Sequence, residues 1–181
     1  MRFVKVVSAV ALGAVLGCGD DGPVDPGNPD EQACTGQISG AGSGVLQSCT
    51  LEAYRVGTEL HHDFKFTVRW SDGQLTDGSI TMIGEGEPAP GQYGLSGFQQ
   101  VAGSVEAPEG LPCSLGAGLD ADHGSLLMRV NTVPEGQDNA GVTMYQWMGG
   151  TLKATFTDPE GGGDICPGEL QLDAEFGPAK K

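Results

Sequence analysis

The stretch Phe64-Lys65-Phe66-Thr67-Val68-Arg69-Trp70 alternates apolar and polar residues without a break. Successive side chains of a β-strand point to opposite faces, so this period of two predicts a strand with one buried and one solvated face. The same period returns at Leu152–Phe156 and Leu170–Phe176, and turn sequences such as Asp77-Gly78 separate such segments. Residues 33–178 are therefore predicted to form a single all-β domain, an antiparallel sandwich or partly open barrel.

Cysteine usage predicts that two disulfides cross-link this domain. The domain contains four of the chain's five cysteines, and the N-terminus, described below, is typical of an exported chain. An even number of cysteines in an exported domain is typical of disulfide pairing, and four cysteines allow three pairings. No Cys-x-x-Cys motif is present, which argues against thioredoxin-like redox chemistry and against zinc knuckles. The four residues are Cys34, Cys49, Cys113 and Cys166.

A hairpin at the start of the domain favours one of the three pairings. The turn-prone segment Ala41–Gly44 separates two strand-like stretches, and a turn centred after residue 41 sets Ile38 opposite Val45. The same register sets Cys34 opposite Cys49, close to the separation that a disulfide needs. We therefore expect Cys34–Cys49, which leaves Cys113–Cys166 as the second bond.

The N-terminus is typical of an export signal. Arg2 and Lys5 provide positive charge, and Phe3–Leu16 is almost wholly apolar. At about 14 residues this run is shorter than the ~20 that a membrane-spanning helix needs, so residues 1–17 are interpreted as a cleaved signal peptide.

The residues that end this run, Val15-Leu16-Gly17-Cys18, resemble the lipobox of bacterial lipoproteins. The resemblance implies cleavage after Gly17 and lipid on Cys18, which anchors the mature chain to a membrane. Leu16 is bulkier than the residue that usually occupies this place. Gly19, instead of an aspartate, favours the outer membrane, with the domain on its periplasmic or cell-surface side. The alternative is an ordinary secreted protein with an unpaired cysteine.

Composition describes the linker and excludes some partners. Residues 18–32 are rich in proline, glycine and acids, so they cannot bury a core and are interpreted as a lipidated tether. The whole chain carries a net charge of −15, and loss of residues 1–17, which hold Arg2 and Lys5 but no acid, makes it −17. Such a chain repels nucleic acid, so nucleic-acid partners are excluded.

The domain also resembles small β-rich envelope lipoproteins of Gram-negative bacteria. The cysteine-bracketed N-terminal hairpin and the strand pair at Gly149–Phe156 and Gly168–Phe176 carry this resemblance. It implies a fold and a location, and it brings no activity or functional residues.

Candidate metal ligands are few. His61 and His62 are adjacent, so on a strand they point to opposite faces, while His61 and Asp63 share the outer face and could form half a metal site. The Asp120-Ala121-Asp122 spacing is reminiscent of calcium loops, but the third acid and the closing glutamate of such loops are missing. The alternatives are a solvated strand start and a plain acidic turn. No cofactor is expected.

Catalytic patterns are also lacking. No serine has glycine two residues before and two after it, as a nucleophile elbow requires. Gly40–Gly44 lacks the lysine and helix of a phosphate loop. Glu85 and Glu87 could pair as a hydrolase does, but chance pairs are common in so acidic a chain. We therefore expect no enzymatic activity.

Aromatic residues offer a ligand face instead. On a strand, Tyr145 and Trp147 would lie on the same face, with Met144 and Met148 on the opposite face. The alternative is that a loop buries both faces.

The sequence favours a lipid-anchored, non-catalytic β-domain that serves envelope structure or binds an envelope protein. The alternative is a module that binds a small ligand or glycan, with or without calcium.

Overall fold

The computed structural model describes residues 33–117, 124–157 and 166–177, and it confirms the all-β fold. Two 3₁₀ turns, η2 (Leu95–Gly97) and η3 (Pro108–Gly110), interrupt the strands. The strands are β1 (Ala33–Gly40), β2 (Gly44–Val56), β3 (Glu59–Trp70), β4 (Leu75–Glu85), β5 (Gly91–Gly94), β6 (Gln100–Ala107), β7 (Leu111–Ala117), β8 (Ser125–Thr132), β9 (Gln137–Asn139), β10 (Val142–Tyr145), β11 (Gly149–Phe156) and β12 (Leu170–Gly177).

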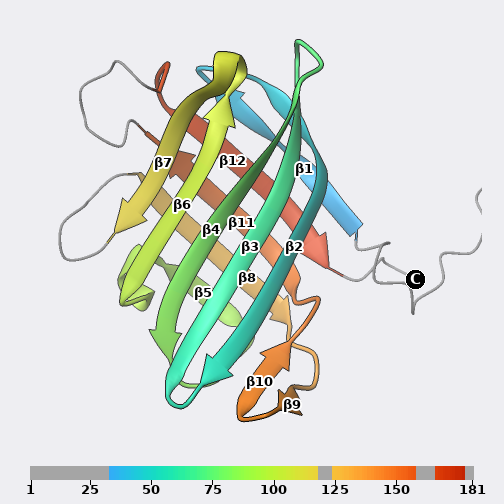
Figure 1. Ribbon diagram of the computed structural model, residues 1–181, viewed down its shortest axis with the longest axis vertical. Helices are drawn as coiled ribbons and strands as arrows, with labels where there is room; N and C mark the ends of the chain where they lie inside the picture. The colour runs from blue at the N-terminus through green and yellow to red at the C-terminus, as the bar shows by residue number, and fades with distance from the viewer. Residues whose placement is uncertain (1–32, 118–123, 158–165, 178–181) are drawn as a thin grey trace, which may run out of the picture.

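The strands form one antiparallel sheet that curls into two layers. Their order is β5-β8-β11-β12-β1-β2-β3-β4-β6-β7, with β10 and β9 attached beside the end of β2. Figure 1 shows the front layer, β2, β3, β4, β6 and β7, crossing over the back layer, β1, β12, β11, β8 and β5. A backbone bridge joins Ser114 of β7 to Thr157, the residue after β11, so the edge strand of the front layer reaches β11 of the back layer. This is the predicted partly open barrel.

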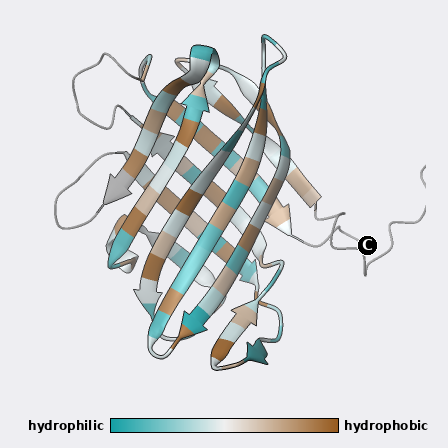
Figure 2. Cartoon of the chain, viewed as in Figure 1, coloured by the Kyte–Doolittle hydropathy of each residue, from teal (hydrophilic) through white to brown (hydrophobic). Residues whose placement is uncertain are grey.

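The core lies between the two layers and follows the predicted alternation. Apolar and polar residues alternate along most strands (Figure 2), and in β3 every second side chain from Leu60 to Trp70 is buried. Phe64 of the front layer contacts Phe176 of the back layer with ring centroids 5.2 Å apart. Phe66 meets Phe156 at 6.2 Å. Burial of each such side chain stabilises the fold by about 1.5–3 kcal/mol, so these contacts hold the layers together.

Both predicted disulfides are confirmed, and each links the two layers. Cys34 of β1 bonds Cys49 of β2, with Cα atoms 5.3 Å apart. Cys113 of β7 bonds Cys166, which precedes β12, at 4.9 Å. Since β2 and β7 are the two outer strands of the front layer, the disulfides staple opposite sides of the barrel.

The predicted register of the first hairpin is wrong by one residue. Ile38 lies opposite Gly44, not Val45, and continuing that register would set Cys34 opposite Ser48. A bulge corrects the offset: β2 passes from Leu46 opposite Val68 to Ser48 opposite Thr67, so Gln47 is an extra residue. A bulge of one residue reverses which face each later side chain takes. Cys49 is thereby turned into the core, where it reaches Cys34.

Several sequence-based expectations fall outside the described residues. Residues 1–32 hold the predicted signal peptide, Cys18 and the tether, and residues 118–123 hold Asp120 and Asp122. In the part of the chain that the structure describes, no helix has the length and apolar character needed to cross a membrane.

Candidate functional site

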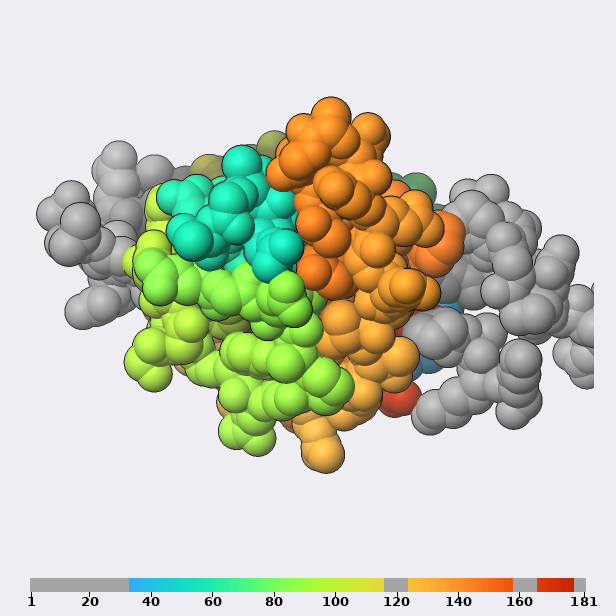
Figure 3. Space-filling model, turned by 90° about the horizontal axis from the view of Figure 1, so that it is seen from below, coloured from blue at the N-terminus to red at the C-terminus, as the bar shows by residue number. Residues whose placement is uncertain are grey.

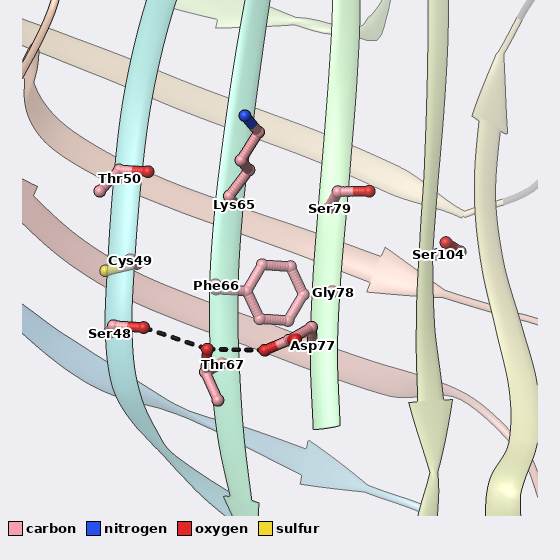
Figure 4. A pocket seen from close by; sticks show the side chains of 10 residues that line it. All are labelled: Ser48, Cys49, Thr50, Lys65, Phe66, Thr67, Asp77, Gly78, Ser79 and Ser104. Atoms are coloured by element: carbon pink, nitrogen blue, oxygen red, sulfur yellow. Dashed lines mark hydrogen bonds between the residues drawn. The ribbon is translucent and has the colours of Figure 1, made fainter. Parts of the chain in front are cut away.

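A shallow groove of about 390 Å³ lies on the outer face of the front layer, over β2, β3, β4 and β6 (Figure 4). Strand register explains its composition, because residues directly opposite each other on neighbouring strands share a face. Thr50, Lys65, Ser79 and Ser104 are successive cross-strand partners and form one row. Ser48, Thr67 and Asp77 form the adjoining row. We call the first set the Lys65 row and the second the Asp77 row.

A glycine lies beneath the groove between these rows. Gly78 lies directly opposite Phe66, whose ring extends across the inner side of the sheet to cover it (Figure 4). A Cβ atom at Gly78 would come within 2.3 Å of that ring, so only glycine fits without a shift of the ring. The sheet is thin at this point, with a buried phenyl ring directly beneath the polar surface.

The two rows differ in how their polar groups are used. In the Asp77 row, the Ser48 hydroxyl donates to Thr67 Oγ1 at 3.1 Å, and the Thr67 hydroxyl donates to Asp77 Oδ1 at 2.8 Å. In the Lys65 row, the ammonium and the three hydroxyls have no hydrogen bond or ion pair within the described residues. With strands ~4.8 Å apart, this row spans roughly 14 Å. It can donate to and accept from an external molecule without breaking an internal bond.

The groove does not contain an assembled nucleophile. The Ser48–Thr67–Asp77 chain ends on a carboxylate, but it contains no imidazole to take the serine proton. Glu85 and Glu87 do not face each other as an acid pair. Glu85 accepts a hydrogen bond from Gln99 at 2.8 Å, and Glu87 pairs with Arg55 at 2.7 Å. The chemistry that the groove offers is hydrogen bonding, with one positive charge at Lys65 and one negative charge at Asp77.

The structure separates Tyr145 from Trp147. Tyr145 is buried, with 9% of its surface exposed, whereas Trp147 is 39% exposed and Met148 is buried. The predicted parity is therefore wrong, because β10 ends at Tyr145 and Trp147 has a left-handed backbone with φ of 58°. Met148 then donates its backbone N–H to the Leu51 carbonyl at 3.1 Å. The two rings do not form one ligand face.

The histidines take the opposite faces that the alternation predicts. His61 stacks on Tyr54 on the outer face, with ring centroids 4.6 Å apart, and its Nε2 lies 3.4 Å from Glu59. Asp63 accepts a hydrogen bond from Thr81 at 2.9 Å. No group of three or more metal-ligating side chains occurs in residues 33–117, 124–157 and 166–177, so the half site of His61 and Asp63 is not completed there.

The burial of His62 without a polar partner is a feature that sequence reasoning missed. Its side chain is 2% exposed, and neither ring nitrogen has a hydrogen-bond partner among the described residues. The rings of Tyr93 and Phe98 cover it, with centroids 6.3 and 5.7 Å away. Burial lowers the pKa of His62 from 6.5 to about 4, while Asp63 raises that pKa and His61 lowers it. The strand period predicts the inward direction, but only tertiary packing decides that no partner reaches the ring.

Two further grooves lie on the back layer. One, of about 510 Å³, contains the Lys153–Asp173 ion pair at 2.7 Å. The other, of about 460 Å³, lies where the described chain begins and ends, at Ala33 and Gly177.

Comparisons with protein-family models, with curated proteins and with solved structures find no match for this chain.

Proposed function

We propose that this protein is an outer-membrane lipoprotein that displays a non-catalytic β-domain to a partner in the cell envelope. Cys18 carries the lipid, residues 19–32 link it to the domain, and the outer face of the front layer contacts the partner. The partner is an envelope protein.

One observation carries the proposal: all four cysteines of the domain are paired, and Cys18 is left over. Two disulfides that staple both sides of a barrel are typical of an oxidising compartment. An exported chain with one surplus cysteine, placed directly after a signal-like segment, is best explained by lipid on that cysteine. Two or more acyl chains give stable anchoring, which a single chain does not.

The Lys65 row is our choice for the contact surface. Three hydroxyls and an ammonium group form one row on the outer face of the sheet, and none of them has an internal partner within the described residues. Binding a partner therefore costs no internal hydrogen bond. The chain is acidic overall, so the positive charge of Lys65 distinguishes this site and helps to orient a bound partner.

The anchor is tested with Cys18→Ser. We expect the wild-type protein to fractionate with outer membranes at high salt and to gain the mass of lipid on Cys18. The variant should become soluble or remain unprocessed. A variant that is processed to the mature size and still fractionates with membranes would refute the anchor.

The contact surface is tested by placing a photo-reactive residue at Ser79, in the Lys65 row, and for comparison at Gln171, which is exposed on the back layer. Irradiation of intact envelopes should cross-link one discrete protein from position 79 and not from position 171. Equal cross-linking from both positions, or from neither, would show that this row is not the contact surface.

The same row supports a second candidate, a glycan-binding module. Sugar hydroxyls hydrogen-bond well to serine, threonine and lysine, and the row is long enough for about two to three sugar rings at strand spacing. This candidate is favoured if no protein cross-links at position 79 while the purified protein binds an envelope glycan. That binding should weaken in Lys65→Ala and not in the back-layer variant Lys153→Ala.

A further inference from the structure

Trp147 is held at the surface by residues on either side of it. Tyr145 is buried before it, and Met148 is buried after it, with its N–H bonded to Leu51 of β2. Between these fixed points Trp147 adopts φ of 58°, which bulky residues seldom take. The residue is 39% exposed. The fold thus accepts an unfavourable backbone conformation and presents an indole ring to the outside.

Other apolar side chains lie where β10, which ends two residues before Trp147, pairs with β2. Val56, which is 47% exposed, lies opposite Val142 on β10, and Met144 lies opposite Tyr54. Val142 and Met144 are half-buried. Figure 3 shows the segment around β9 and β10, in orange, beside the β2–β3 turn, in cyan. Trp147 is the one aromatic residue among the large exposed apolar side chains of the described chain.

The described chain begins and ends at the same corner. Ala33 pairs with Gly177, and Gly150 pairs with Phe176. A Cβ atom on Gly177 would lie 2.8 Å from the Cα atom of Gly149, two residues after Trp147. Figure 1 shows the start of β1 and the end of β12 on the side where β11 begins. The chain that leads back to Cys18 therefore leaves the domain next to the segment that carries Trp147.

Chain length limits how far this corner can lie from the anchor. Fifteen residues separate Cys18 from Ala33. A chain rises at most ~3.6 Å per residue, so Ala33 stays within about 50 Å of the lipidated cysteine. The start of β1 is the part of the domain closest to the anchor along the chain, and it lies at the corner that also holds Gly149, two residues after Trp147.

We propose that Trp147 inserts into the headgroup region of the bilayer that anchors Cys18. An indole has an apolar body and one N–H donor, which suits the membrane–water interface. The acidic chain disfavours anionic lipid, so the expected partner is a zwitterionic surface. The contact sets the orientation of the domain, with the β10 edge toward the membrane. This inference rests on the lipid anchor of the proposed function.

Fluorescence quenching of the full-length, lipidated protein tests the inference. The protein is reconstituted into phosphatidylethanolamine and phosphatidylcholine vesicles that carry bromine near the headgroup end of the acyl chains. The chain has two tryptophans, and Trp70 is buried in the core. We expect the wild type to lose the part of its emission that comes from Trp147. The matched variant Trp147→Phe, in which only Trp70 emits, should show no quenching.

The outcomes separate this inference from the proposed function. If mass spectrometry finds lipid on Cys18 and bromine quenches neither protein, the bilayer contact is refuted and the anchor stands. Equal quenching of the wild type and Trp147→Phe also refutes the contact, because the signal then comes from Trp70. If Cys18 carries no lipid, the anchor fails and this inference fails with it. Quenching that disappears in Trp147→Phe supports the contact.

Discussion

Strand β3 and the segment that joins β10 to β11 contain similar residues and behave in opposite ways. In β3 the apolar side chains from Leu60 to Trp70 alternate into the core without interruption. From Tyr145 to Trp147 the sequence alternates in the same way, yet Tyr145 is buried and Trp147 is at the surface. A left-handed residue inserted between β10 and β11 breaks the period.

The difference lies in what surrounds each segment. β3 is paired along its whole length with β2 and β4, so the pleat alone decides which way each side chain points. The residues after β10 leave the front layer and enter the back layer through Gly149 and Gly150. A chain that changes layers needs an irregular residue to turn. Alternation is therefore reliable in the middle of a sheet and unreliable where the chain crosses between layers.

The largest effect is expected in β3, from Phe64→Ala. The ring is fully buried and contacts Phe66 and Phe176, so its loss should lower the free energy of unfolding by about 4 kcal/mol. Lys65 is the next residue and lies on the exposed face of β3, so Lys65→Ala should change the free energy of unfolding by less than about 0.5 kcal/mol. Urea unfolding of both variants gives the comparison. Similar losses for the two would mean that the pleat of β3 does not divide core from solvent.

The sequence was sufficient for the parts of the fold that depend on local period and on cysteine count. The β3 alternation and the opposite directions of His61 and His62 follow from patterns visible in the chain, and the cysteine count predicts two disulfides. The choice of Cys34–Cys49 depended on a hairpin register that is wrong by one residue, and the bond forms because the Gln47 bulge turns Cys49 into the core. No local pattern in the sequence marks this bulge.

The candidate site was less predictable than the fold. The Lys65 row joins residues from four strands, and it appears only when the register of each strand pair is known. A shift of one residue in any pair would turn a hydroxyl of this row inward. The absence of a partner for His62 likewise depends on Tyr93 and Phe98, which lie more than 30 residues along the chain. Neither feature has a local signal.

Removing the disulfides one at a time compares the two sides of the barrel. The Cys113–Cys166 bond closes a loop of 53 residues, and Cys34–Cys49 closes one of 15. Loop-closure entropy assigns about 4 kcal/mol to the first and about 3 kcal/mol to the second. We expect Cys113→Ala with Cys166→Ala to lower the free energy of unfolding more than Cys34→Ala with Cys49→Ala. The reverse order, measured in urea, would show that the hairpin side holds the layers together.

Acid should destabilise the protein through His62. The pKa of this residue is about 4 in the folded state and about 6.5 when unfolded, because burial penalises the charged ring. Between these values the unfolded chain binds a proton that the folded chain does not, so stability falls as the pH falls. The change is about 3 kcal/mol between pH 7 and pH 4.

Two variants isolate this effect from the titration of carboxylates. His62→Phe keeps an aromatic ring beside Tyr93 and Phe98 but cannot be protonated, so its stability should depend less steeply on pH between 4 and 6.5. Lys65→Ala, on the exposed face of the same strand, should keep the slope of the wild type. Equal slopes for the wild type and His62→Phe would mean that the buried imidazole is not the group that titrates.

The smallest change in the free energy of unfolding is expected at Trp147, whose backbone has a conformation that a bulky side chain disfavours. Glycine adopts a positive φ without strain, so Trp147→Gly should remove about 1–2 kcal/mol of strain. Glycine has more conformational freedom in the unfolded chain, which lowers the free energy of unfolding by about 0.5–1 kcal/mol. The net change should lie between zero and about 1.5 kcal/mol of added stability. Thr143→Gly, in β10 and without a positive φ, should instead lose about 0.5–1 kcal/mol. If Trp147→Gly lost more than Thr143→Gly in urea unfolding, contacts of the indole would hold this corner together, and the ring would not be free to meet a membrane.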